Sequence, residues 1–352
     1  MFAVTKIRGA KLNKPRKLWL NNDKLEECKV TLVYTVLKEK IMLRIGTQSD
    51  TWYNDLDPDG SLAFYKKCGF TAIDFDLNRY IKARDMSKQD GGPYTSFYDQ
   101  SVEELHEYFA PLKAALEKYD IEVSQIHAPF PNWMPGKDEF NEYLAMVNEK
   151  CLAIAAYLGC PGIVVHPVEL TGDIAREGNL HMYRHLIPAA KKYGVKILLE
   201  NIFARFNGRF KQGRMSHPEE AIEYFEMLNA EAGFEAFGFC FDVGHAIITC
   251  QDIPAFIRRM GHRITNLHIH DNNGLDDLHL MPYSCLTTGA NFVSDWDGIV
   301  EALRDIGYRG ALCFETFKSV RIMPEAVRGE VLSLISAIGR HWSDRILGEE
   351  KA

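Results

Sequence analysis

From Met42 onward, short apolar runs alternate with amphipathic stretches, and this alternation restricts the fold more than any other feature. Each run has the length of a strand and is rich in β-branched or aromatic residues, whereas the stretches between the runs repeat apolar residues at helical spacing. Strands that are apolar along their whole length are typical of a parallel sheet buried on both faces. The eight predicted strands are Leu43–Gln48, Thr71–Asp76, Glu122–His127, Gly162–His166, Lys196–Glu200, Gly238–Asp242, Ile264–His268 and Ala311–Glu315.

Helical patterns separate most of these runs, and the combination indicates a closed barrel. Eight parallel strands that alternate with helices predict a (β/α)8 TIM barrel, which is the fold we expect for this α/β chain. A doubly wound open sheet is the alternative, but it usually carries a glycine-rich turn after its first strand, and residues 49–53 contain no glycine. The predicted helices are Ser101–Tyr119, Glu139–Leu158, His181–Tyr193, His217–Leu228, Ile253–Met260 and Trp296–Ile306.

The first part of the chain differs in charge from the remainder. Residues 1–40 hold ten Lys or Arg and four Asp or Glu, a net of +6 in a chain whose total is −7. The apolar stretch that follows these charges is too short for a secretory signal. We expect 1–41 to be a solvated N-terminal extension, 42–345 a single barrel domain and 346–352 a C-terminal tail. A basic arm that contacts an anion or a partner subunit is the alternative interpretation of the extension.

Composition excludes several classes of protein. The chain is 46% hydrophobic, which excludes disorder over most of its length, and no run reaches the roughly 18 apolar residues of a membrane span. Its negative net charge does not favour a nucleic-acid partner. Eight Cys without a CxxC pair indicate buried thiols in a reducing compartment. We therefore expect a cytoplasmic protein that binds neither membranes nor nucleic acid, and we leave a homo-oligomer open.

Polar side chains of the metal-binding type stand where six of the predicted strands end. All strand C-termini of such a barrel open onto one face, where active sites are built. Buried carboxylates are costly unless they are paired or bind a cation, so their convergence predicts a metal site. We expect one divalent ion, with Mn²⁺ favoured over Zn²⁺, Co²⁺ or Mg²⁺ for such a mixed donor set. The four ligands predicted from the ends of strands five to eight are Glu200, Asp242, His268 and Glu315.

The motifs around these residues resemble those of the xylose-isomerase-like barrel superfamily. That superfamily contains sugar and sugar-phosphate isomerases and epimerases together with the AP endonucleases, and the resemblance covers about residues 43–340. It implies the same metal ligands, in the motifs LLEN, FDVGH, HIHD and FET. A further stretch, Asp277-Leu278-His279 with Pro282, Gly289 and Asp295-Trp296, resembles the family's D-x-H…P…G…D-W pattern, whereas MPYSCLTTGANF replaces the usual P-P-G-E-G.

The resemblance also implies proton transfer next to a carbonyl group. A divalent ion that holds a carbonyl oxygen and the adjacent hydroxyl acidifies the C–H between them and stabilises an enediolate. Glu200 and Glu315 stand on strands five and eight, so they can flank a substrate and act as the base and the acid. We therefore predict a sugar or sugar-phosphate isomerase or epimerase, whose partner is a small sugar or sugar derivative.

Other residues are candidates for substrate binding. His127, His166 and His245 are expected to hydrogen-bond substrate hydroxyls, and Asp277 and His279 join them through the family motif. The predicted loop Asn201–Ser216 carries Arg205, Arg209, Lys211 and Arg214, of which one or two bind a phosphate or carboxylate or are merely solvated. Trp52, with Tyr53, Phe130 and Trp133, either covers the apolar face of a sugar ring or packs within the loops.

Three other functions remain open at this stage. A metal-dependent keto-polyol dehydratase of the same superfamily would use the same ligands. An AP-endonuclease-like zinc nuclease would use nine ligands for three ions, and matching residue types occur at His127, His166, Glu200, Asp242, His245, His268, Asp277, His279 and Glu315. A metal-free sugar-binding protein is disfavoured, because no position of this donor set holds an inert residue. Metal content discriminates between one ion and three.

Overall fold

The computed structural model describes residues 42–170, 172–286 and 294–349. The predicted extension 1–41, Gly289 and the last residues of the predicted C-terminal tail lie outside the described residues. All eight predicted strands are present in the described part. They are β1 (Ile45–Gln48), β2 (Ala72–Asp76), β3 (Glu122–His127), β4 (Gly162–Val164), β5 (Lys196–Glu200), β8 (Phe237–Asp242), β9 (Ile264–His268) and β10 (Leu312–Phe314).

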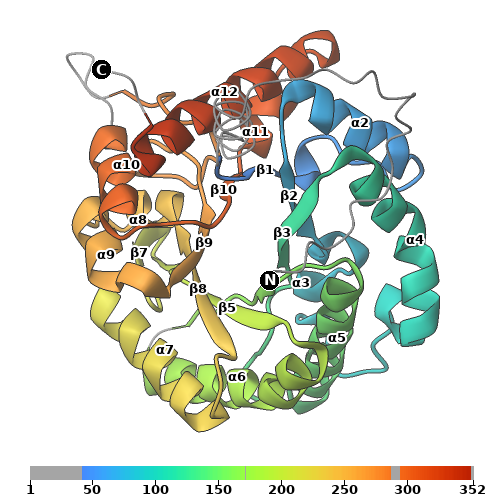
Figure 1. Cartoon of the computed structure of the whole chain (residues 1–352). Coiled ribbons are helices and arrows are strands. Elements are labelled where there is room, and N and C mark those ends of the chain that lie inside the picture. The colour runs from blue at the N-terminus through green and yellow to red at the C-terminus, as the bar shows by residue number, and fades with distance from the viewer. Residues whose placement is uncertain (1–41, 171, 287–293, 350–352) are drawn as a thin grey trace, which may run out of the picture. The chain divides into compact units, whose positions relative to one another are not determined.

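The strands form one parallel sheet that follows the order of the chain and closes on itself. Each strand from β1 to β5 pairs with the next, β5 pairs with β8, β8 with β9, and β10 with β1. Between β9 and β10 the Ile269 amide donates to the Cys313 carbonyl at 2.8 Å, and the Glu315 amide donates to the Ile269 carbonyl at 3.0 Å. The predicted TIM barrel is thus confirmed, and Figure 1 shows its strands ringed by helices.

The helices form the outer layer and bury their apolar faces against the strands. The longer ones are α2 (Pro58–Cys68), α4 (Val102–Tyr119), α5 (Asp138–Tyr157), α6 (Asp173–Tyr193), α7 (Pro218–Ala232), α9 (Ile253–Met260), α10 (Trp296–Asp305) and α12 (Arg328–Leu347). Short helices α3 (Ala83–Met86), α8 (Val243–Ile248) and α11 (Phe317–Arg321) follow β2, β8 and β10. Local sequence fixes their ends: Ser101 and Glu104 form a capping box at the start of α4.

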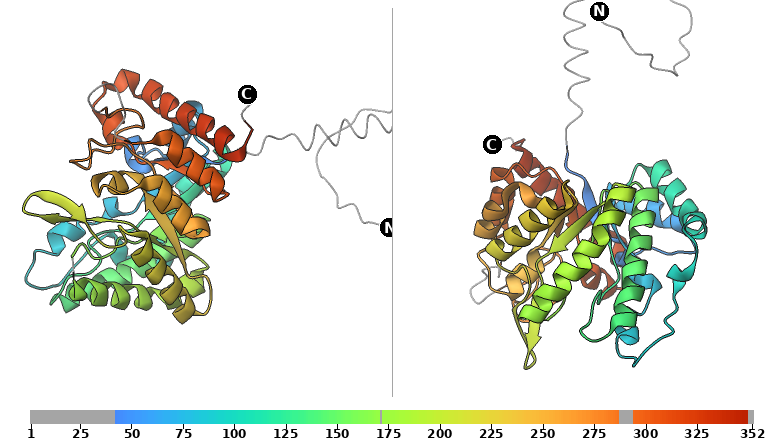
Figure 2. Two further views of the ribbon diagram at one scale, coloured as in Figure 1. Left: turned by 90° about the vertical axis from the view of Figure 1, so that its left-hand side faces the viewer. Right: turned by 90° about the horizontal axis from the view of Figure 1, so that it is seen from below.

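The segment after β5, predicted as a loop, is instead a two-stranded hairpin. Strands β6 (Phe203–Phe206) and β7 (Arg209–Gln212) pair antiparallel. The two turn residues, Asn207 and Gly208, have φ of 50° and 71°. An Asn-Gly pair favours the tight hairpin turn in which both central residues take positive φ, and this signal was overlooked in the sequence. Figure 2 shows the hairpin projecting from one end of the barrel.

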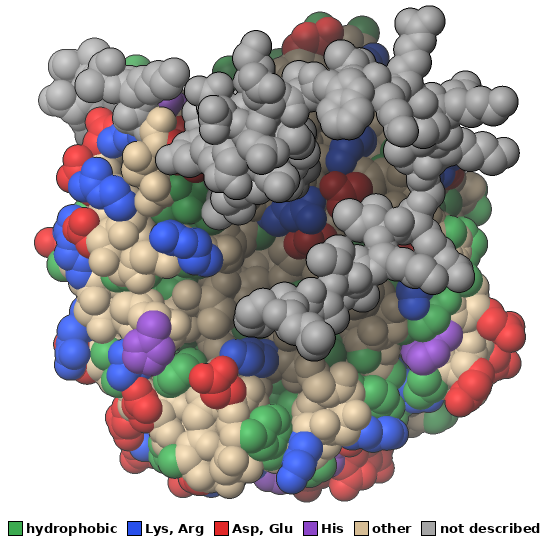
Figure 3. All heavy atoms as spheres, viewed as in Figure 1, with side chains coloured by type: hydrophobic (Ala, Val, Ile, Leu, Met, Phe, Trp, Pro, Cys, Tyr) green, Lys and Arg blue, Asp and Glu red, His purple; other side chains and the backbone are tan. Residues whose placement is uncertain are grey.

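The outer surface of the barrel is mixed in charge. Ion pairs link adjacent helices, such as Arg184 of α6 with Glu231 of α7 and Arg258 of α9 with Asp305 of α10. In Figure 3, acidic and basic side chains are mixed on the left and lower parts of the face. Among the described residues, no helix combines the length and the apolar character that a membrane crossing requires. The seven cysteines in the described part of the chain carry free thiols.

Candidate metal centre

A cavity of about 270 Å³ opens at the C-terminal ends of the barrel strands. Its walls come from the residues that end the strands, from the loops after β1, β2 and β4, and from the β6–β7 hairpin. Asp242 and His268 lie beneath it and are fully buried. Most of the predicted site residues line this one cavity, namely His127, His166, Glu200, Arg205, His245, Asp277, His279 and Glu315.

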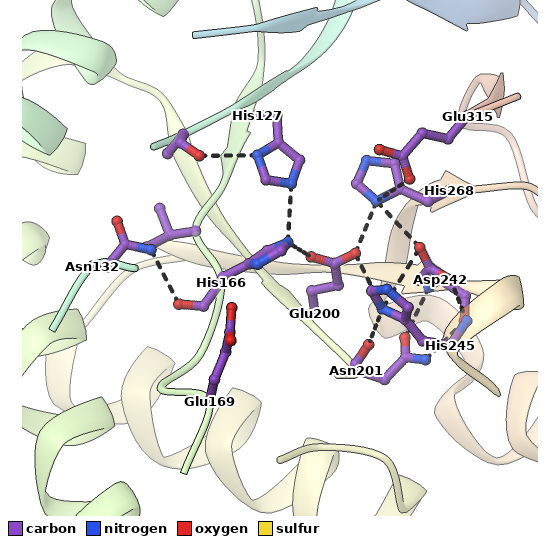
Figure 4. A network of polar contacts seen from close by, with 12 residues as sticks. His127, Asn132, His166, Glu169, Glu200, Asn201, Asp242, His245, His268 and Glu315 are labelled. Carbon is purple, nitrogen blue, oxygen red and sulfur yellow. Dashed lines mark hydrogen bonds and ion pairs between the residues drawn. The ribbon is translucent and has the colours of Figure 1, made fainter. Parts of the chain in front are cut away.

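The four predicted metal ligands meet around the imidazole of His268. Its Nδ1 atom lies 2.9 Å from Oε1 of Glu200, 3.7 Å from Oδ2 of Asp242 and 3.9 Å from Oε2 of Glu315. Figure 4 shows the three carboxylates pointing toward this nitrogen, two from the ends of β5 and β8 and one from the residue after β10. The structure therefore brings together the donors that the strand ends predicted.

Two residues on the first two strands hold this group in place, and the sequence analysis missed both. Asp74 of β2 accepts a hydrogen bond from Nε2 of His268 at 3.0 Å and another from Gln125 at 3.1 Å. Gln48 at the end of β1 donates to Oε1 of Glu315 at 2.7 Å. These contacts leave two atoms facing the point where the four predicted ligands meet, namely Nδ1 of His268 and Oε2 of Glu315.

Asp242 owes its orientation to its position at a strand-to-helix junction. It ends β8 and caps α8, and its Oδ1 accepts the backbone amide of His245 at 2.6 Å. The side chain of Asn201 also brackets the Asp242 backbone, with two hydrogen bonds of 2.8 Å. These contacts tie the end of β5 to the end of β8, and Oδ2 of Asp242 remains directed at the centre.

A second group of donors extends from Glu200 toward β3 and β4. Nε2 of His166 lies 2.9 Å from Oε2 of Glu200, and Nε2 of His127 lies 3.0 Å from Nε2 of His166 (Figure 4). Nδ1 of His127 contacts the Ala128 carbonyl at 2.9 Å. His127, His166 and Glu200 thus offer donor atoms within 4.8 Å of one another.

A third group lies on the other side of Asp242. Its donors, His270, Asp277 and His279, are also within 4.8 Å of one another, and His270 likewise groups with Asp242 and His245. The His270 ring stacks on His279 with centroids 4.1 Å apart. His270 lies where a side chain at Gly244 would be, because a Cβ there would come 1.8 Å from the ring.

Neighbouring charges set the protonation of the buried carboxylates. Burial disfavours the charge on Glu200, but His166 and His268 outweigh burial and hold its pKa well below the usual range. Burial likewise opposes ionisation of Asp277, but His279 and other histidines lower its pKa. Burial raises the pKa of Glu315 to about 8, even though His268 acts against it. The site therefore holds acids of very different strength.

Burial and neighbouring charges also give the histidines different pKa values. Burial, with His166 beside it, lowers the pKa of His127 to about 4. Burial would lower the pKa of His245 as well, but Asp242 and Glu200 raise it to about 9. Near neutral pH, the His127 ring is neutral, whereas the His245 ring carries a positive charge in the absence of a cation.

The residues present fit a divalent cation. Metal-binding histidines usually pass their second nitrogen to a carbonyl or carboxylate, which fixes the ring. That pattern recurs here: His268 contacts Asp74, His127 contacts the Ala128 carbonyl, and His245 Nδ1 contacts the Asn201 carbonyl at 2.9 Å. In addition, Oδ1 of Asp277 is buried and has no hydrogen-bond partner among the described residues. Three carboxylates around one point would repel one another without a cation.

The remaining predicted residues divide between the cavity and the surrounding structure. Arg205 lines the cavity, whereas Arg214 pairs with Glu220 at 2.6 Å beside the start of α7. Trp52 does not line the cavity: its ring stacks on Phe64 with centroids 4.3 Å apart. The structure thus places Trp52 in packing between local elements and not against the cavity where a sugar would bind.

Two carboxyl groups on β2 show what the sequence reasoning overlooked. Asp74 and Asp76 interrupt an otherwise apolar strand whose residues are all buried. Burial, reinforced by Asp50, raises the pKa of Asp76 to about 8. Acids at alternate positions of a buried strand point to one face, and this pattern would have identified both as site residues.

The fold and the site define a class of protein: a (β/α)8 barrel with a carboxylate and histidine donor set at the C-terminal ends of its strands. The chain belongs to the xylose isomerase-like TIM barrel family, whose model matches residues 62–336. A relative from Methanocaldococcus jannaschii, an uncharacterized protein, is 28% identical over 235 residues, which cover 62% of this chain and 73% of that protein.

Solved structures of the same architecture resemble the chain along most of its length. A D-tagatose 3-epimerase-like protein superposes with a TM-score of 0.59 at 21% identity, covering 85% of this chain and 99% of that one. An L-ribulose 3-epimerase superposes with a TM-score of 0.59 at 18% identity, covering 88% and 99%. At this level of identity, the likeness shows the shared fold.

Proposed function

We propose that the protein is a divalent-metal-dependent sugar isomerase or epimerase that acts by proton transfer through an enediolate. The observation that carries the proposal is the placement of Glu200, at the end of β5, and Glu315, directly after β10, which line one cavity and face the same nitrogen of His268. Similarity to proteins described as tagatose and ribulose 3-epimerases supports the substrate class.

The proposed roles follow from the arrangement of the chain's own residues. A bound divalent ion polarises the substrate carbonyl and so acidifies the neighbouring C–H. Glu200 and Glu315 come from strands separated by β8 and β9, so they reach a substrate from different sides. One carboxylate removes the proton, and the other returns a proton to the opposite face of the carbon in an epimerisation. In an aldose–ketose isomerisation, a single carboxylate shuttles the proton between adjacent carbons.

Histidines around the cavity position the substrate. His127, His166 and His245 are proposed to hydrogen-bond its hydroxyl groups, together with Asp277 and His279 on the loop after β9. Each of these side chains is at least half-buried and lines the same cavity, so it is held in place before a substrate arrives. Held donors and acceptors bind with less loss of side-chain entropy than mobile ones.

The test is hydrogen exchange with solvent. Protein loaded with Mn²⁺ is incubated in D₂O with a panel of ketoses, ketose phosphates and inososes, and the products are examined by NMR and mass spectrometry. The proposal expects deuterium on the carbon next to the carbonyl, together with an isomer or epimer of the substrate. Products without solvent deuterium from every substrate would contradict it, and loss of water from an inosose would favour the dehydratase alternative.

A second candidate function has a specific observation in its favour. The structure assembles four groups of donors, three of which contain Glu200 or Asp242, and together with Glu315 they include the nine residues that match a three-zinc nuclease of this superfamily. Metal analysis and DNA cleavage separate the two candidates. Three zinc ions per chain with incision of DNA at an abasic site would favour the nuclease, whereas one ion and no incision would favour the isomerase.

A further inference from the structure

The cavity contains one charged side chain that the metal centre does not use and that no other described residue neutralises. Arg205 lines the cavity wall, and the structure gives it no ion-pair or hydrogen-bond partner within the described ranges. Its contacts are with aromatic rings: the guanidinium carbon lies 4.7 Å from the centre of the Phe210 ring and 5.8 Å from that of Phe203. A stacked guanidinium keeps its edge, with its hydrogen-bond donors, free for another group.

The register of the hairpin explains why this arginine faces the cavity and its neighbours do not. Side chains alternate between the faces of a strand, so Phe203 and Arg205 share one face. Arg205 is paired with Phe210 across the hairpin, whereas Arg209 and Lys211 are paired with Phe206 and Ala204 on the opposite face. Of these residues, only Phe203 and Arg205 line the cavity.

Aromatic contacts hold that face of the hairpin over the site. The Phe203 ring meets the ring of His245 edge-on with centroids 4.9 Å apart, and it meets Phe210 at 4.5 Å. The base of the hairpin is closed by the Ile202 amide, which donates to the Arg214 carbonyl at 3.0 Å. Arg205 therefore contacts Phe203, whose ring packs against His245 of the metal centre. The side chain of Arg205 itself is exposed at the cavity mouth.

The other charges on the cavity wall that lie outside the metal centre are already matched. Asp50 pairs with Arg321 at 3.0 Å, and Glu169 pairs with Arg84 at 3.4 Å. Asp76, whose pKa burial raises to about 8, is largely uncharged near neutral pH. Among the charged side chains of this wall outside the metal centre, Arg205 is thus the one without an ion-pair partner in the described part of the chain.

We propose that Arg205 binds an anionic group of the substrate, a phosphate ester or a carboxylate, at the mouth of the cavity. Arginine donates two parallel hydrogen bonds to either group, and such charge-assisted pairs are stronger than neutral ones. The inference rests on the proposed function for the identity of the reacting end, and it narrows the substrate class to sugar phosphates or sugar acids.

The experiment measures binding, so that it does not depend on turnover. Ribitol, ribitol 5-phosphate and ribonate are titrated by calorimetry into Mn²⁺-loaded wild-type protein and into the variants R205A, R205K and R209A. Arg209 is the matched control, because it lies on the same hairpin and is exposed on the face opposite to Arg205. Thermal unfolding of each variant shows that the protein remains folded.

The wild type is expected to bind one of the two anionic ligands about 10- to 100-fold more tightly than ribitol, because hydrogen bonds between opposite charges typically give a gain in affinity of this size. R205A should lose this preference, R205K should keep part of it, and R209A should keep all of it. Comparison of ribitol 5-phosphate with ribonate distinguishes phosphate from carboxylate. A wild type that binds all three ligands equally, or an R205A variant that retains the preference, overturns the inference. These ligands have no aldehyde or ketone group to react, so a failure of the D₂O exchange test would leave this result unaffected.

Discussion

Nε2 of His268 lies 3.0 Å from Oδ2 of Asp74, and this contact directs the other ring nitrogen toward Glu200. Both side chains are 1% exposed, so the pair lies beneath the cavity where solvent cannot substitute for either partner. A histidine held in this way presents one lone pair in a fixed direction, which is the role that outer carboxylates commonly have at metal sites.

Replacement of Asp74 by Asn should weaken metal binding. The amide keeps the size of the side chain but lacks the negative charge that favours a proton on Nε2 of His268. Nδ1 of His268 therefore becomes a weaker metal ligand. Loss of such an outer partner typically lowers metal affinity by about 10- to 100-fold, which a Mn²⁺ titration measures. Asp76→Asn is the matched control, because Asp76 is a buried acid of the same strand without a His268 contact. Equal affinity of D74N and the wild type would contradict the role.

The substitutions Glu200→Gln and Glu315→Gln should lower turnover more than they lower metal binding. Glutamine keeps an oxygen that can coordinate, but it cannot accept a proton from carbon. If the reaction is an epimerisation, each variant should therefore lose about 10²- to 10⁴-fold in turnover, and neither should incorporate deuterium from D₂O. His245→Ala should cost less, because His245 is proposed to contact a substrate hydroxyl. Near-wild-type turnover of either Gln variant would refute the two-carboxylate mechanism and favour a hydride shift.

Asp76 should make the barrel less stable as the pH rises. Its pKa is about 8 in the folded protein, against an ordinary value of 3.8, so the folded chain holds a proton that the unfolded chain releases between these values. The free energy of unfolding should then fall by up to about 1.4 kcal/mol per pH unit in this range. The free energy of unfolding is measured by urea titration at pH 5, 6 and 7 with a chelator present, and it should fall less steeply with pH in Asp76→Asn than in the wild type. Parallel slopes for the two proteins would show that Asp76 is ionised when folded.

Deletion of residues 1–40 should leave a folded barrel that still binds metal. The helices and strands that build the barrel and the candidate ligands lie within residues 45–347 of the described structure. The truncated chain should unfold cooperatively, with a Mn²⁺ affinity within about twofold of that of the full chain, since the candidate ligands all belong to the barrel that remains. Insoluble or non-cooperative protein after truncation would show that the extension is part of the core or of an interface.

The barrel could be predicted from the sequence, because each strand is an apolar run and a helical pattern follows most of the strands. Strands β3, β5 and β9 begin and end at the predicted residues. The residues at strand ends were also predictable, because parallel topology gathers strand C-termini at one face. Glu200, Asp242, His268 and Glu315 therefore needed no knowledge of three-dimensional contacts.

The strand-end rule does not cover a residue in the middle of a strand. Asp74 could have been marked as a site residue by its alternation with Asp76 in a buried strand, but its partner, His268, lies 194 residues further along the chain and was found only from the structure. His270 was not among the predicted site residues, although its ring packs against His279 and lies beside Asp242. The hairpin after β5 was different, since its Asn207-Gly208 turn was visible in the sequence and its period of two places Arg205 and Phe203 together.

The hydrogen bond from Gln48 to Glu315 joins residues 267 positions apart, one on the first strand and one just after the last. The complete donor set therefore exists only once the barrel has closed. A chain still emerging from the ribosome offers Glu200, Asp242 and His268 long before Glu315 is synthesised. If the centre binds a cation as proposed, the ion can take its final coordination only after Glu315 has been synthesised and the last strand has paired with the first, so metal content would report closure of the barrel.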